Sequence, residues 1–105
     1  STRGYIIGGF DCSTGRTYTE FIEYNPITDS WIQLANFNDR ISSKASGFVI
    51  DENLYVYATG NCVSNFENTF FCFNTSTNTW SNKSNFPGIA SVRGLGFSIG
   101  RKGYI

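Results

Sequence analysis

Histidine is absent from the 105 residues, and its absence removes several kinds of chemistry. Without histidine the segment cannot form a Ser–His or Cys–His nucleophile pair. The three cysteines include no CxxC pair, so no zinc signature remains either. We therefore predict no catalytic residues, no metal ligands and no cofactor in this segment.

Net charge and long apolar runs are missing too. Eight Lys and Arg residues balance eight Asp and Glu residues, which gives no electrostatic attraction toward nucleic acid or anionic lipid. No apolar run approaches the roughly 18 to 20 residues that a membrane helix needs. No charged-then-apolar leader opens the sequence. We expect no nucleic-acid partner and no membrane insertion, and neither a signal peptide nor an anchor within these residues.

A 3.6-residue apolar period is also lacking, so the sequence predicts no helix. Aromatic residues are plentiful instead, at 17% of the chain, and they fall in short runs with β-branched residues. GFVIDENLYVYATG consists of two such runs separated by Asp51-Glu52-Asn53, which is the composition of a β-hairpin. GFSIGRKGYI repeats this plan with a turn over residues 100–103. The pattern predicts an all-β fold.

The sequence contains an internal repeat. EYNPITDSW, residues 23–31, is followed by CFNTSTNTW, residues 72–80, at a period of 49 residues. The same offset places Phe37 on Phe86 and Phe48 on Phe97, whereas upstream an offset of 50 places GYIIGGFDC on LYVYATGNC. Repeats of this length indicate a stack of similar structural units.

Each repeat is expected to supply four short antiparallel strands, near residues 45–50, 54–59, 69–73 and 80–83. A preceding strand is expected at 4–9, and further strands at 94–99 and 103–105. A sheet with two apolar faces must stack against copies of itself, and twisted sheets stacked around an axis form a propeller. The recurring tryptophan, on the outer strand, is expected to cover the gap to the neighbouring sheet. The expected structural positions are Gly8, Gly9, Tyr24, Trp31, Gly47, Tyr55, Phe73, Trp80, Gly96 and Tyr104.

These residues resemble the kelch repeat, whose strands form the blades of β-propellers. The resemblance rests on YIIGG (5–9), YNPITDSW (24–31), Leu34, Arg40, Gly47 and LYV (54–56). The second copy departs from it, with Ala58-Thr59-Gly60 in place of a glycine doublet and Thr75 in place of Pro26. The tail is similar to Bacteroidetes-type kelch repeats of bacteria, which implies an extracytoplasmic location. The resemblance divides the chain into a partial blade and loop (1–44), a full blade (45–83) and the start of the next blade (84–105).

Kelch propellers close with more blades than the two or so that this chain supplies. Two explanations remain open. The chain is a segment of a longer propeller, or copies of it associate, because RGYI (3–6) and KGYI (102–105) occupy equivalent repeat positions.

The resemblance implies a non-catalytic binding module that recognises a protein or a carbohydrate through its loops. The alternative is a fragment of a propeller enzyme, a sugar epimerase or an oxidase-like protein, whose active residues lie outside this segment. In an up-and-down blade, alternate connections emerge on opposite sides, so loops 10–19, 36–44, 61–68 and 85–93 share one side. These loops differ between the copies, as recognition loops do. The donors expected to bind carboxylates or sugar hydroxyls are Arg16, Arg40, Lys44, Asn61, Asn65 and Arg93.

A disulfide between Cys12 and Cys62 is not expected, and the sequence leaves the redox state of the three cysteines open. Cys12 and Cys62 occupy equivalent repeat positions, and equivalent positions in adjacent blades lie farther apart than the roughly 7 Å that a disulfide allows between Cα atoms. Cys72, inside TFFCF, is predicted to be a small buried hydrophobic residue.

Overall fold

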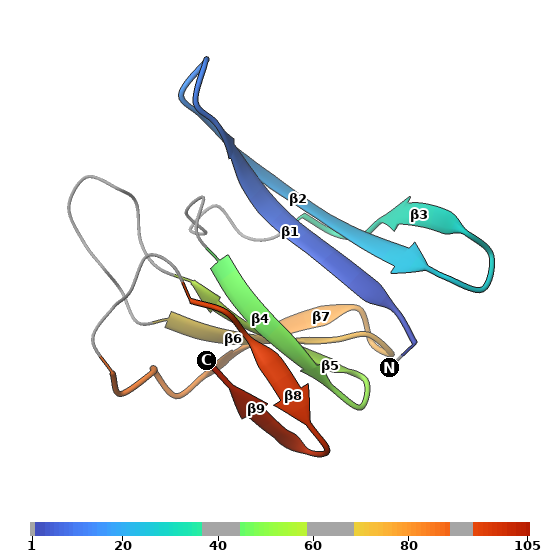
Figure 1. Cartoon of the computed structure of the whole chain (residues 1–105), viewed down its shortest axis with the longest axis vertical. Helices are drawn as coiled ribbons and strands as arrows, with labels where there is room; N and C mark the ends of the chain where they lie inside the picture. Colours follow the sequence, from blue (N-terminus) through green and yellow to red (C-terminus); the bar gives the residue numbers. More distant parts are fainter. Residues whose placement is uncertain (1, 37–44, 59–68, 89–93) are drawn as a thin grey trace.

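The computed structural model describes residues 2–36, 45–58, 69–88 and 94–105. Within these ranges the chain forms nine strands in three antiparallel sheets and contains no helix, which confirms the all-β prediction (Figure 1). Every strand pairs with its neighbour in the chain, so each sheet is a simple meander. The first sheet contains β1 (Gly4–Asp11), β2 (Arg16–Asn25) and β3 (Ser30–Gln33). The second contains β4 (Ala45–Ile50), β5 (Asn53–Ala58), β6 (Thr69–Asn74) and β7 (Thr79–Lys83), and the third contains β8 (Phe97–Ile99) and β9 (Lys102–Tyr104).

The strand bounds agree with the sequence prediction in the second sheet and differ at two other places. β4 matches its predicted range, and the other strands of this sheet match to within one residue. The predicted loop over residues 10–19 is wrong, because β1 continues to Asp11 and β2 begins at Arg16. The strand predicted from Gly94 begins only at Phe97. A Cβ at Gly96 would overlap the backbone of Gly47, so this stretch passes β4 in close contact.

Ring geometry recurs at the repeat offset, which shows that the repeated sequence folds into repeated structure. In each case the two rings keep their separation and their class of orientation, stacked or tilted. The recurring pairs are Tyr24–Trp31 (4.7 Å) with Phe73–Trp80 (4.9 Å), Tyr5–Phe21 (5.8 Å) with Tyr55–Phe70 (5.9 Å), and Phe48–Tyr55 (5.4 Å) with Phe97–Tyr104 (5.2 Å).

The turns that precede the two tryptophans also share one conformation. Asn25 and Asn74 each accept a hydrogen bond from the backbone amide two residues on, at 3.0 and 2.9 Å. Four residues after each asparagine, Asp29 and Asn78 adopt the left-handed conformation, with φ of 50° and 56°. Asparagine and aspartate tolerate this region better than other non-glycine residues. The turn therefore depends on its asparagine and not on Pro26, which is why Thr75 can replace the proline in the second copy.

The core lies between the first and second sheets. Phe21 of β2 is fully buried, with 0% of its surface exposed, and it packs against Leu54, Val56 and Phe73. The Trp80 ring lies 5.2 Å from the Phe21 ring, so Trp80 covers the gap between these sheets as predicted. Trp31 occupies the matching site on the outer strand β3 but is 56% exposed.

The opposite face of the second sheet is also aromatic, and the third sheet covers part of it. We call this face the Phe70 face; side chains alternate along a strand, so it carries Phe48, Tyr55, Tyr57, Phe70 and Cys72. Gly103 of β9 lies against the Phe48 ring, where any Cβ would overlap the ring. Cys72 is 5% exposed, which confirms its predicted burial, and Cys12 is exposed and unbridged. Cys62 lies outside the described residues.

The glycine pair Gly8-Gly9 marks an irregularity in the β1–β2 ladder. The register shifts between Ile7 and Gly9, so that the two residues Thr19 and Glu20 oppose Gly8 alone. Gly8 has a φ of 68°, which a side chain would disfavour. Bulges of this kind sharpen the local twist, and beyond this point β1 and β2 extend past the rest of the first sheet (Figure 1).

Candidate binding surface

The connections between strands divide into two sides, as the up-and-down topology predicts. The turn side holds residues 26–29, 51–52, 75–78 and 100–101, and the loop side holds residues 12–15, 34–36, 84–88 and 94–96. Contacts across the turn side confirm this grouping for the second sheet. The carbonyl of Glu52 accepts hydrogen bonds from the Thr75 amide, at 3.0 Å, and from its hydroxyl, at 2.8 Å. The Ser76 hydroxyl donates to the Glu52 carboxylate.

Polar groups of the turn side therefore form hydrogen bonds with one another. Asp51 also forms an ion pair with Arg101 at 3.1 Å, which joins the turns of the second and third sheets. The asparagine turn recurs in the first and second sheets, so this part of the turn side has the same conformation in both copies. Such a surface stabilises the scaffold, and it leaves the more varied loop side as the candidate for recognition.

The β1–β2 hairpin tip is the described loop-side segment that extends farthest (Figure 1). Its turn is closed by a hydrogen bond from the Gly15 amide to the Asp11 carbonyl, at 2.8 Å. The Asp11 carboxylate accepts hydrogen bonds from the Ser13 hydroxyl (2.6 Å), the Thr14 hydroxyl (2.8 Å) and the Ser13 amide (2.8 Å). These bonds favour the ionised form and lower the pKa of Asp11 to about 2.

Arg16 is the one predicted donor that lies in the described part of the chain. It begins β2, is exposed, and holds its guanidinium 5.1 Å from the centre of the Tyr18 ring. Stacking on an aromatic face orients a guanidinium while leaving its N–H edge accessible. The other predicted donors, Arg40, Lys44, Asn61, Asn65 and Arg93, lie outside the described residues.

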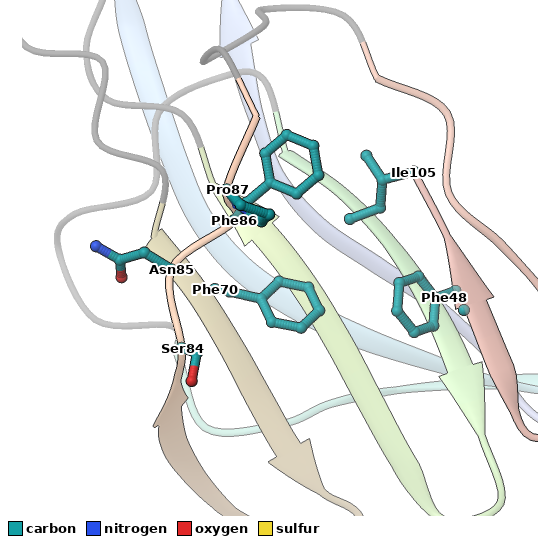
Figure 2. A pocket seen from close by; sticks show the side chains of 8 residues that line it. Phe48, Phe70, Ser84, Asn85, Phe86, Pro87 and Ile105 are labelled. Atoms are coloured by element: carbon teal, nitrogen blue, oxygen red, sulfur yellow. The ribbon is translucent and has the colours of Figure 1, made fainter.

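A cavity of about 360 Å³ opens beside the Phe70 face, on the loop side. Figure 2 shows the rings of Phe48, Phe70 and Phe86 around this space together with Ile105, and the Asn85 amide points away from them. Pro87, Ser84 and Gly103 complete the lining. The rings come from β4, from β6 and from the segment that follows β7, and the Phe86 ring is held by Tyr57 at 5.1 Å.

Sequence reasoning did not predict this cavity as a site. The sequence marks Phe48 and Phe86 only as members of the repeat, and Phe70 only as part of a strand. The repeat nevertheless holds a signal that could have found it, because Phe70 is the equivalent of Phe21 at an offset of 49 residues. Phe21 has aromatic partners across a sheet interface, and among the described residues Phe70 has ring partners only in its own sheet.

The described residues include no group of three or more Cys, Asp or Glu side chains that could hold a metal ion. Burial raises the pKa of the Cys72 thiol, which disfavours the reactive thiolate. No helix in the described part of the structure could span a membrane. No model of a known protein family matches this sequence, so the function is inferred from the geometry of the cavity and the hairpin tip.

Proposed function

We propose that the chain is a non-catalytic, kelch-type segment of a β-propeller that binds a protein partner through its loop side. The repeated sheets, each packing an aromatic face against the next, support the propeller part of this proposal. The resemblance of YIIGG, YNPITDSW and LYV to kelch motifs supports the family. The hydrogen bonds and the ion pair within the turn side support the choice of the loop side as the binding surface.

The observation that carries the proposed function is the aromatic lining of the cavity. Three phenylalanine rings, a proline and an isoleucine bound it, and Ser84 and Asn85 are the polar residues in its lining. A sugar ring needs several directed hydrogen bonds, whereas an aromatic side chain needs apolar area and ring contacts. The lining therefore favours an aromatic side chain of a protein partner, rather than a carbohydrate, as the bound group. The hairpin tip, with Arg16, is suited to contact a carboxylate on the same partner.

A small indole probe tests this proposal. N-acetyl-L-tryptophanamide, titrated into the chain with specifically labelled phenylalanine, should shift the aromatic NMR signals of Phe48, Phe70 and Phe86 in a saturable way. Ser84→Arg, which places a charged side chain in the cavity, should remove the shifts, and Arg16→Ala should leave them unchanged. Methyl glucoside serves as the carbohydrate probe. Shifts with the glucoside and not with the indole, or no shifts with either, would contradict the proposed function.

A further inference from the structure

The first sheet has an exposed apolar face that points away from the second sheet. We call it the Trp31 face; it carries Ile6, Ile22, Tyr24 and Trp31, which alternate with the residues that point toward the core. Ile6 is 52% exposed, and the Tyr24 ring packs against Trp31 at 4.7 Å. Trp31 is 56% exposed, and Ile22 and Tyr24 are half-buried. Apolar side chains gathered in this way on one face of a sheet mark interaction surfaces.

The second sheet shows what covers the equivalent face. There the matching pair is Phe73 and Trp80, and both rings contact Phe21 of the first sheet, at 4.7 and 5.2 Å. The chain thus contains one complete example of the interface, in which an aromatic–tryptophan pair on one sheet packs on a phenylalanine of the next.

The chain also contains the other half of a second such interface. Phe70 is the repeat equivalent of Phe21, and its ring contacts Phe48 and Tyr55 within its own sheet, at 6.1 and 5.9 Å. On its remaining side lies the cavity. The cavity is therefore the place where an aromatic–tryptophan pair would stand if the interface of Phe21 were repeated at Phe70.

We propose that copies of this chain associate head to tail, with the Tyr24–Trp31 pair of one copy in the cavity beside Phe70 of the next. This inference rests on the proposed function, since it names the partner that the cavity takes. The two surfaces are unlike, so the contact is heterologous and each copy keeps one free surface at each end. Repetition of such a contact gives a ring if the rotation closes and a filament if it does not.

Docking requires an exchange of strands. β9 occupies the position next to β8 that β1 of the incoming copy would take, because Gly103-Tyr104-Ile105 is the repeat equivalent of Gly4-Tyr5-Ile6. β9 holds β8 through three residue pairs, and so small a hairpin is marginal in isolation. β1 pairs with β2 through seven residue pairs, and its other edge meets no strand in the described parts of the chain. Exchange would place Tyr5 of the incoming copy opposite Phe97 and complete a four-stranded sheet.

Sedimentation velocity over a range of concentrations tests the association. The unsubstituted chain should self-associate, and Trp31→Ala should raise the dissociation constant by roughly thirtyfold or more, as truncation of a central interface aromatic does. Ile27→Ala is the matched control, because Ile27 is 79% exposed but lies in a turn and not on the Trp31 face. A chain that stays monomeric at every concentration, or equal effects of the two substitutions, would overturn the inference.

Mixing two variants tests the head-to-tail geometry. Trp31→Ala keeps the cavity and Ser84→Arg keeps the tryptophan, so each should be monomeric alone and an equimolar mixture should form dimers that grow no further. A mixture that stays monomeric would refute a heterologous contact. Deletion of residues 102–105 should strengthen association, since it removes the competing strand, and weaker association would refute the exchange. If N-acetyl-L-tryptophanamide binds the cavity while copies fail to associate, the proposed function stands and this inference alone fails.

Discussion

Truncation of the two tryptophans should have very different effects on stability, although they occupy equivalent positions in the repeat. Trp80→Ala removes a ring that packs at 5.2 Å from Phe21 and at 4.9 Å from Phe73, at the boundary between the first and second sheets. Trp31→Ala removes a ring that is 56% exposed and packs on Tyr24. The pair isolates the effect of the neighbouring sheet, because the local turn and strand are the same.

The expected magnitudes follow from burial. Replacing a buried tryptophan with alanine costs about 3–5 kcal/mol, and Trp80 is half-buried, so its loss should cost about 3 kcal/mol. Trp31 shields little apolar surface in a single copy, and its loss should cost less than about 1 kcal/mol. Trp80→Phe keeps a ring against Phe21 and should fall between these values, which gives a measurable variant if Trp80→Ala does not fold.

Urea denaturation measures both variants, at a concentration where sedimentation shows a single copy. With a slope of about 1–3 kcal/mol per molar urea, a loss of about 3 kcal/mol lowers the midpoint by roughly 1–3 M. Slopes that match those of the unsubstituted chain would show that the native and denatured states are otherwise unchanged. Equal losses for the two variants, or a loss below about 1 kcal/mol for Trp80→Ala, would refute the packing role assigned to Trp80.

Three further predictions concern the connections. Hydrogen bonds, of which the one from the Ser13 hydroxyl has the largest effect, lower the pKa of Asp11 from 3.8 to about 2. The ionised carboxylate therefore stabilises the turn above pH about 4, and this contribution is lost as the pH falls toward 2. Ser13→Ala should raise the pKa of Asp11, and an unchanged midpoint in a ¹³C NMR titration would contradict this. Arg101→Gln should cost less than about 1 kcal/mol, because the side chains of Arg101 and Asp51 are 85% and 56% exposed, and the cost should disappear at high salt in thermal unfolding. Asn78→Ala should lower the free energy of unfolding by about 1 kcal/mol, because the φ of Asn78 is 56° and alanine disfavours this conformation. Asn78→Gly should leave the stability unchanged, and a lower melting temperature for the glycine variant would argue against that explanation.

The strands of the second sheet could be predicted because two local signals agree there. Apolar and aromatic runs mark β4 and β5, and Asp51-Glu52 marks the turn that sets their register. The hairpin tip could not be predicted in the same way. The extension of β1 to Asp11 depends on cross-strand pairing with Arg16 and Thr17, and the polar sequence between them suggested a loop.

The cavity and the Trp31 face could not be predicted from the sequence for a different reason. Each repeat position carries the same kind of side chain, so sequence alone gives Trp31 and Trp80 the same environment. Burial depends on which sheet lies opposite, and this is a property of the arrangement and not of the local pattern. Trp80 has Phe21 opposite it, whereas Phe70 has a cavity. The predicted donors remain predictions, since Arg16 alone lies within the described residues.

The meander topology also bears on the order in which the chain folds during synthesis. Each strand pairs with its neighbour in sequence, so the first sheet can form as soon as β3 has been made. Phe21 gains its last core partner only when Trp80 is made, 47 residues after β3 ends at Gln33. At roughly 5 to 20 residues per second, the first sheet therefore waits about 2 to 9 s before its core is complete. During this interval the nascent chain is most exposed to aggregation, and a chaperone that binds aromatic β-strands would act there.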